Sequence, residues 1–301
     1  MKKVIKLALI FGLTFGTFYA CNDTDDAEVA ASKEERVITE IQMAEVSVQD
    51  LQEELISEEI LNDVLIDILG DLSLKSGSID SCPIRTVEKL SENRFPRKIT
   101  RDFGEGCEHF GKLKTGKIIT TLNAPYYEEK AVHKVEFEAY TINGIAIDGH
   151  KQIQYLGTNE DEQPQFRIMS NIFLIRPNGI EVHRVEHKER ILIAGFDTKN
   201  DASDNENMIT GSSSVTKSNG VHYKMEIIEP MHWANSCKWA LAGVKEIKIF
   251  KTEKDLKADN GAEKSGSKNY VSLTLDFGDG NCDNILTYMI EGEEAIEVEL
   301  K

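Results

Sequence analysis

The chain has 301 residues, of which 40% are hydrophobic and 29% are charged, a composition within the range of globular proteins. Its 52 acidic and 35 basic residues give a net charge of −17, and three of the lysines, Lys2, Lys3 and Lys6, lie in the first six residues. This excess of negative charge repels phosphate backbones, so sequence-independent binding to nucleic acids is excluded. No internal apolar run approaches the roughly 20 residues that a membrane-spanning helix needs.

Residues 1–20 are typical of a secretory signal peptide, with basic residues, an apolar run from Leu7 to Phe18, and Ala20 before Cys21. The segment Phe18-Tyr19-Ala20-Cys21 resembles a bacterial lipobox, although Phe18 and Tyr19 depart from the residues usual at those positions. The resemblance implies that Cys21 becomes the N-terminus and carries diacylglycerol and palmitate as a membrane anchor. An ordinary secreted protein with an incidental Cys21 is the alternative.

An acidic stretch, residues 22–26, follows Cys21 and contains no apolar residue. We expect residues 21–33 to form a flexible tether. The stretch resembles the acidic export signal of surface lipoproteins in Bacteroidota, which implies an outer-membrane lipoprotein that is exposed on the cell surface. Acidic residues that merely keep a linker soluble are the alternative.

Residues 34–74 show the periodicity of an amphipathic helix. Apolar residues recur three or four positions apart in a seam that comprises Val37, Ile41, Ala44, Val48, Leu51 and Leu55. A second apolar set runs from Ile60 to Gly70, and Ser57 stands before it as an N-cap. We therefore expect two consecutive helices or one bent helix. The seam is too short for a coiled coil, so packing on the chain's own domain is favoured over a partner helix.

Residues 80–301 have the pattern of an antiparallel β domain. Turn signals recur every ten to fifteen residues between β-branched and aromatic runs, and they include Asn143-Gly144, Pro177-Asn178-Gly179 and Asn219-Gly220. Further hairpins are predicted at Gly243 and Gly292. The expected fold is mainly β, a meander of roughly a dozen strands that forms a sandwich or a curved open sheet behind an N-terminal helical segment.

An internal repeat selects a disulfide pairing. The segments Ile99–Cys107 and Leu273–Cys282 share Thr-x-Asp-Phe-Gly-[Glu/Asp]-Gly before a cysteine, and each copy, residues 82–122 and 237–300, has a second cysteine upstream. Without Cys21, four cysteines admit three pairings. If the copies fold alike, Cys82 pairs with Cys107 and Cys237 with Cys282. Metal-bound thiols are the rival, but neither pair has the short spacing of a zinc site. The polar surplus in the second copy, residues 252–268, predicts an inserted loop.

The segment Phe95-Pro96-Arg97-Lys98-Ile99-Thr100 before the first Asp-Phe-Gly motif, and Asp-Phe-Gly-Asp-Gly-Asn-Cys-Asp-Asn near the C-terminus, resemble a lipoprotein family of Bacteroidota. The resemblance covers about residues 80–301. It implies an envelope protein and supplies no catalytic residue.

Two clusters have residue types suited to metal ions. Asp276, Asp279, Asn281 and Asp283 place oxygen atoms in a glycine-rich turn, as Ca²⁺ requires, but the spacing is not that of an EF-hand. We favour carboxylates that cap backbone amides there. His183 and His187 are four residues apart, which on a strand separates them by about 13 Å. We therefore expect no cofactor, with Ca²⁺ as the alternative.

Aromatic residues offer a stacking surface for a sugar or a peptide at Tyr126, Tyr127, Trp233 and Trp239, although core packing is favoured for Trp239. No catalytic motif of a hydrolase, a P-loop or a dinucleotide site is present. The favoured hypothesis is a lipid-anchored, non-enzymatic module that binds a protein or glycan partner or has a structural role. A carrier of lipid or glycolipid with an apolar groove is the second, and a glycan or peptide hydrolase the third.

Overall fold

A computed structural model describes residues 43, 45–65, 82–198, 204–259 and 269–300. The predicted signal peptide, Cys21 and the acidic tether lie outside these residues. Besides an N-terminal helix, residues 45–65, the described chain contains a short helix, α2 (Glu253–Ala258). Its strands are β1 (Ile84–Lys89), β2 (Arg97–Asp102), β3 (Cys107–His109), β4 (Lys112–Leu122), β5 (Val132–Ile142), β6 (Ile145–Thr158), β7 (Pro164–Ile175), β8 (Glu181–Ala194), β9 (Glu206–Lys217), β10 (His222–Ala234), β11 (Ala242–Phe250), β12 (Tyr270–Asp279), β13 (Ile285–Ile290) and β14 (Ile296–Glu299).

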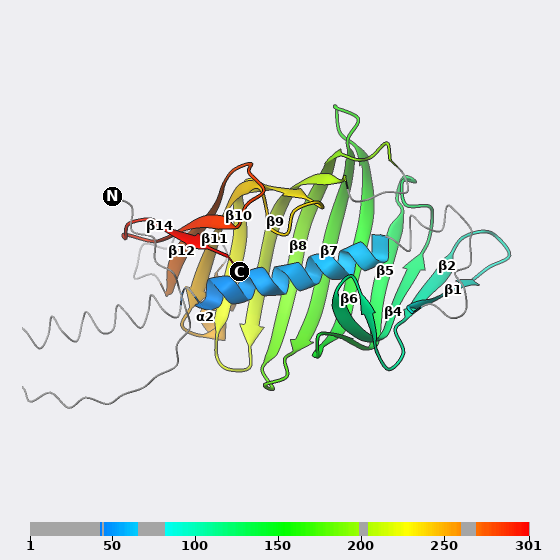
Figure 1. The fold of residues 1–301 in the computed structure, drawn as a ribbon, viewed down its shortest axis with the longest axis horizontal. Helices are drawn as coiled ribbons and strands as arrows, with labels where there is room; N and C mark the ends of the chain where they lie inside the picture. The colour runs from blue at the N-terminus through cyan, green and yellow to red at the C-terminus, as the bar shows by residue number, and fades with distance from the viewer. Residues whose placement is uncertain (1–42, 44, 66–81, 199–203, 260–268, 301) are drawn as a thin grey trace, which may run out of the picture.

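All strands belong to one 14-stranded antiparallel sheet (Figure 1). Neighbours in the sheet follow the order of the sequence from β1 to β14, except that β2 and β3 both pair with β4. The predicted meander is therefore confirmed, and of the two predicted forms it is the open sheet.

Tight turns join the strands where the sequence predicts them. Asn143 and Gly144 have φ angles of 48° and 79° between β5 and β6, the left-handed conformation that a two-residue hairpin requires. The turns at Asn219-Gly220 and Gly292 are also confirmed. The hairpin expected at Gly243 is wrong, since this residue lies within β11. A Cβ atom there would be 2.6 Å from the Pro230 carbonyl oxygen, so the glycine permits a close approach at a β-bulge.

The two repeats lie at opposite ends of the sheet, and both predicted disulfides are formed. Cys82, before β1, bonds Cys107, and Cys237, before β11, bonds Cys282, which follows β12. Each bond closes the open end of a hairpin, as the repeat predicts. The predicted inserted loop of the second copy, residues 252–268, is partly helical, because α2 occupies residues 253–258 with Thr252 as its N-cap. Residues 260–268 lie outside the described part of the chain.

One continuous helix, residues 45–65, crosses one face of the sheet, which we call the inner face (Figure 1). The helical prediction is confirmed for these residues, and the rest of 34–74 lies outside the described chain. The apolar seam predicted to pack on the chain's own domain is buried only in part, with Leu51 5% exposed. Val48 of the apolar seam is 42% exposed, whereas Asp50 and Glu53 are fully buried. Ser57 is not an N-cap either, because it lies within the helix. None of the described helices is long and apolar enough to span a membrane.

Candidate functional site

The inner face of the sheet carries buried charges in an unusual number. Along β8 the side chains that alternate onto this face are Arg184, Glu186, Lys188 and Arg190, between Val182 and Leu192, and all six are buried. Lysine and arginine are rarely buried unless they are paired. Eight buried residues of this kind contact the helix, and we call them the inner-face cations: Arg101, Lys114, Lys151, Arg184, Lys188, Arg190, Lys217 and Lys245.

The N-terminal part of the helix places Asp50 and Glu54 between strands β8 and β11. Arg184 donates to Asp50 over 2.7 Å, Lys188 donates to Glu54 over 2.7 Å, and Lys245 donates to both carboxylates over 2.8 and 2.9 Å. Burial raises the pKa of Glu54, but the attraction of Lys188 and Lys245 outweighs it and lowers the pKa to about 2. Both helix carboxylates therefore remain charged at neutral pH.

Glu53 is bound by a separate set of side chains. Its Oε1 accepts a hydrogen bond of 2.8 Å from Arg176, which follows β7, and lies 2.9 Å from the Lys217 ammonium. The hydroxyl of Tyr223 donates to Oε2 over 2.8 Å. Burial and the neighbouring carboxylates raise the pKa of Tyr223, which keeps this hydroxyl protonated as a donor. Side chains from β9, from β10 and from the turn after β7 thus converge on a single carboxylate.

Ser57 lies at the middle of the helix above Lys151 of β6 and Glu186 of β8. Its Oγ donates to Glu186 over 2.7 Å, and the Lys151 ammonium donates to the Oγ and the carbonyl oxygen of Ser57 over 2.7 and 2.9 Å. Ser170 of β7 also donates to Glu186, over 2.6 Å. Burial lowers the pKa of Lys151 to about 8, despite the attraction of Glu186. Beside this group, Arg190 donates to Glu58 of the helix.

The C-terminal part of the helix reaches the other end of the sheet. Lys114 of β4 donates to Glu59 over 2.5 Å and to Asp63 over 2.6 Å. Tyr140 of β5 donates to Asp63 over 3.3 Å, and Arg101 of β2 lies 3.7 Å from the same carboxylate. The helix carboxylates from Asp50 to Asp63 are therefore matched by cations of the sheet.

Apolar contacts accompany the ion pairs. Ile60, Leu61 and Val64 of the helix are at most 1% exposed and belong to the same core cluster as Ile99 of β2 and Ile172 of β7. The buried side of the helix thus contains both apolar and acidic residues. The inner face contains both apolar and basic side chains. It therefore fits an acidic amphipathic helix rather than a purely apolar ligand.

The predicted calcium residues form turns instead of a cluster. Asp276 accepts a hydrogen bond from the amide of Gly278 over 2.9 Å, and Asp283 accepts one from the amide of Ile285 over 3.0 Å. Asp279 accepts from the side-chain amide of Asn281 over 2.8 Å. The contacts of Asp276 and Asp283 are the backbone capping that the sequence favours over a calcium site. In the described residues, no group of three or more His, Cys, Asp or Glu side chains is placed to hold a metal ion.

The remaining candidate residues are not among the inner-face cations. His183 and His187 both lie on β8, as predicted, where His183 stacks on Phe173 with ring centroids 4.4 Å apart. Tyr126 stacks on Phe166 at 4.6 Å and Tyr127 adjoins it, so these rings pack against each other. Trp233 and Trp239 are half-buried against the core, in accord with the expected packing of Trp239.

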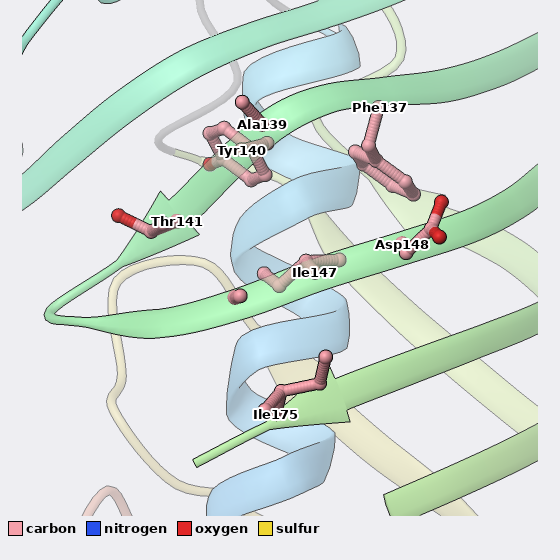
Figure 2. A pocket seen from close by; sticks show the side chains of 8 residues that line it. Phe137, Ala139, Tyr140, Thr141, Ile147, Asp148 and Ile175 are labelled. Carbon is pink, nitrogen blue, oxygen red and sulfur yellow. The ribbon is translucent and has the colours of Figure 1, made fainter. Parts of the chain in front are cut away.

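A shallow pocket of about 430 Å³ lies where β5 bulges away from β6 (Figure 2). It is lined by Phe137 and Ala139 of β5, Asp148 of β6 and Ile175 of β7, among others. Ala139 has a φ of 47°, which an extra residue in the strand imposes. Figure 2 shows the helix behind the strands in this view, and Tyr140, which also lines the pocket, donates to Asp63 of the helix.

Sequence reasoning missed the inner-face cations. In β8 the even-numbered residues from 184 to 190 are all charged. Alternating charged residues normally predict the solvent-exposed face of a strand, so this alternation by itself gives no sign that these side chains are buried. A usable signal was present in the combination of features. Lysines and arginines share one parity of a long strand in a chain of net charge −17, and an acidic helix precedes the sheet.

No family model, curated protein or solved structure matches the chain.

Proposed function

We propose that the chain is a lipid-anchored outer-membrane protein, exposed on the cell envelope, that acts as a non-enzymatic binding module. The observation that carries the binding role is the basic inner face, which holds an entire acidic helix through side-chain ion pairs. Lys245, for example, joins two helix carboxylates, Asp50 and Glu54. The lipid anchor follows from the lipobox-like sequence at Cys21.

The charge states of the inner face support a binding role over catalysis. Acid–base catalysis works best when the pKa of the catalytic group lies near the operating pH. Ion pairing outweighs burial at Glu54 and Glu186, where it lowers the pKa, and at Lys188, where it raises it. Lys151, with a pKa of about 8, is 1% exposed and already donates to Ser57. The paired groups act as fixed charges.

The same surface supports a binding module over a carrier of lipid. A lipid groove requires apolar strands on the inner side and space for the acyl chains. Here Arg184, Glu186 and Lys188 interrupt the apolar residues of β8, and the helix covers them. Burying acyl chains against these charges would be unfavourable.

Metabolic labelling with an alkyne analogue of palmitate tests the anchor. The wild-type chain should take up the label and sediment with membranes, and Cys21→Ser should abolish both. Lys238→Ala, an exposed change beside the second disulfide, serves as the control and should retain both. A wild-type chain that is exported without label would contradict the anchor.

A second experiment tests the absence of catalysis. The purified mature chain is incubated with panels of glycans and peptides, and the products are followed by mass spectrometry. No turnover is expected. If turnover occurs and Lys151→Met abolishes it while the fold is retained, the inner face is an active site and the binding proposal fails.

A further inference from the structure

The contact between the helix and the sheet is made by side chains, apart from the hydrogen bond that Lys151 donates to the Ser57 carbonyl oxygen. Among the described residues, no backbone-to-backbone hydrogen bond joins residues 45–65 to a strand, and the strands pair with one another in an unbroken ladder. The contact is therefore that of two separate surfaces that fit together, as in a complex between two chains.

The contact contains many buried charges, which stability alone does not explain. Charged residues are depleted at the centre of protein interfaces, and replacing a buried ion pair by apolar residues is often neutral or stabilising. Buried polar groups of this kind have an attested role in fixing the register of a helix at a cost in stability. They also keep both surfaces compatible with water when they separate, because free carboxylates and ammonium groups are well hydrated.

The covalent connection is long enough for the helix to reach another molecule. About 18 residues lie between residue 65 and Ile84, the first residue of β1, and fully extended they span roughly 60 Å. The helix itself is about 32 Å long at 1.5 Å per residue. Fully extended, the connection would exceed the length of the helix.

The charge pattern identifies the partner. Asp50, Glu53 and Glu54 meet cations of β8, β9 and β11, and Asp63, about three turns further along, meets Lys114 of β4. A foreign helix has to present carboxylates at the same spacings and apolar residues between them. A second copy of this chain does so by identity.

We propose that residues 45–65 of one copy dock on the inner face of a second copy, so that neighbouring chains exchange helices and form dimers. The exchanged contacts equal those within one chain, so the balance between monomer and dimer depends on the connection and on concentration. The proposal rests on the binding role given above and names the occupant of the same inner face, but it does not depend on the lipid anchor.

Cross-linking between two single-cysteine variants tests the exchange. Both carry Cys21→Ser, and the four remaining cysteines are held in disulfides. One variant has Glu58→Cys on the helix and the other, enlarged by a fusion tag, has Arg190→Cys on β8, because these two side chains meet within one chain. They are mixed, unfolded and refolded together, and then treated with a short bismaleimide.

Helix exchange predicts a cross-linked heterodimer in about tenfold larger amount than in a control mixture where the exposed Gln52 carries the helix cysteine. Docking brings Glu58 but not Gln52 to Arg190, so random collision cannot produce this difference. Equal heterodimer in the two mixtures, or none, overturns the proposal.

Complementation of full-length variants provides a second, independent test. One variant, Asp50→Lys with Glu54→Lys, has a defective helix and an intact inner face; the other, Arg184→Glu with Lys245→Glu, has the reverse. Together they should form a one-to-one heterodimer, measured by light scattering, with a melting transition above that of either variant alone. A mixture that behaves as the sum of two monomers contradicts the exchange. If either variant fails to fold alone, a folded heterodimer after co-refolding still supports the helix exchange. If co-refolding gives no folded protein, the cross-linking experiment decides whether the helices exchange.

Discussion

Replacing Arg184 by methionine should destabilise the fold more than most single substitutions. The guanidinium is fully buried and lies 2.7 Å from Asp50, 2.9 Å from Glu186 and 3.8 Å from Glu53. Methionine fills much of the same volume but carries no charge. The buried carboxylates of Asp50, Glu53 and Glu186 then lose one of the cations that compensate their charge.

Removing one partner of a buried ion pair costs about 3–5 kcal/mol, because the other charge stays buried without compensation. A typical domain has about 5–15 kcal/mol of stability, so this loss is a large share of the total. Urea unfolding at pH 7, followed by circular dichroism, measures it. The matched control is Arg167→Met, which removes the half-exposed ion pair with Glu189 and should cost about 1 kcal/mol or less.

The loss in Arg184→Met should also depend on pH. Arg184 lowers the pKa of Asp50 and Glu186, so removing it lets these two carboxylates take up protons in the folded state more readily as the pH falls. The difference in stability from the wild type should therefore shrink between pH 7 and pH 4. The reasoning is refuted if Arg184→Met costs no more than Arg167→Met.

Three further predictions concern other parts of the same surface and its frame. The pKa of Glu54 falls from 4.5 to about 2 on folding, so its stabilisation, roughly 3 kcal/mol, is present above pH 4.5 and lost as the pH drops toward 2; Glu54→Gln should flatten this part of the stability curve. Burial lowers the pKa of Lys151 from 10.5 to about 8, so its charge destabilises the fold below pH 8, and this penalty fades as the pH rises toward 10.5; Lys151→Met should cost less than about 1 kcal/mol at pH 7 by urea unfolding. Gly116→Ala should cost about 1–3 kcal/mol more than Gly104→Ala in the same assay, because both have positive φ but only at Gly116 would a Cβ lie 2.2 Å from the Ala139 carbonyl oxygen.

The order of the strands and the two disulfides could be predicted because they depend on short sequence motifs. Asn143-Gly144 and Asn219-Gly220 mark hairpins through backbone angles that few other residues adopt, and each turn fixes the pairing of two neighbouring strands. The repeated Asp-Phe-Gly motif predicted the disulfides, since Asp102 and Asp276 make the same contact with a glycine amide two residues later. An open sheet with strands in sequence order needs little more information than this.

The face of the helix was not predictable from apolar periodicity alone. That reasoning places Val48 toward the sheet, but the buried side is shared by Leu51 and by carboxylates such as Asp50, whose burial depends on distant cations. Lys245, about 195 residues away in the sequence, is one of them. Periodicity registers an acidic position as exposed unless the partner is known, so the register of this contact requires the tertiary structure.

An exchange of charges at one ion pair tests most directly that the inner face holds the helix by charge complementarity. Glu58→Arg and Arg190→Glu are measured singly and together by urea unfolding at pH 7. Each single change should cost about 2–4 kcal/mol because it places like charges together in a largely buried site, and the double variant should regain at least half of the summed loss. A double variant as unstable as the sum of the two single changes would contradict the account.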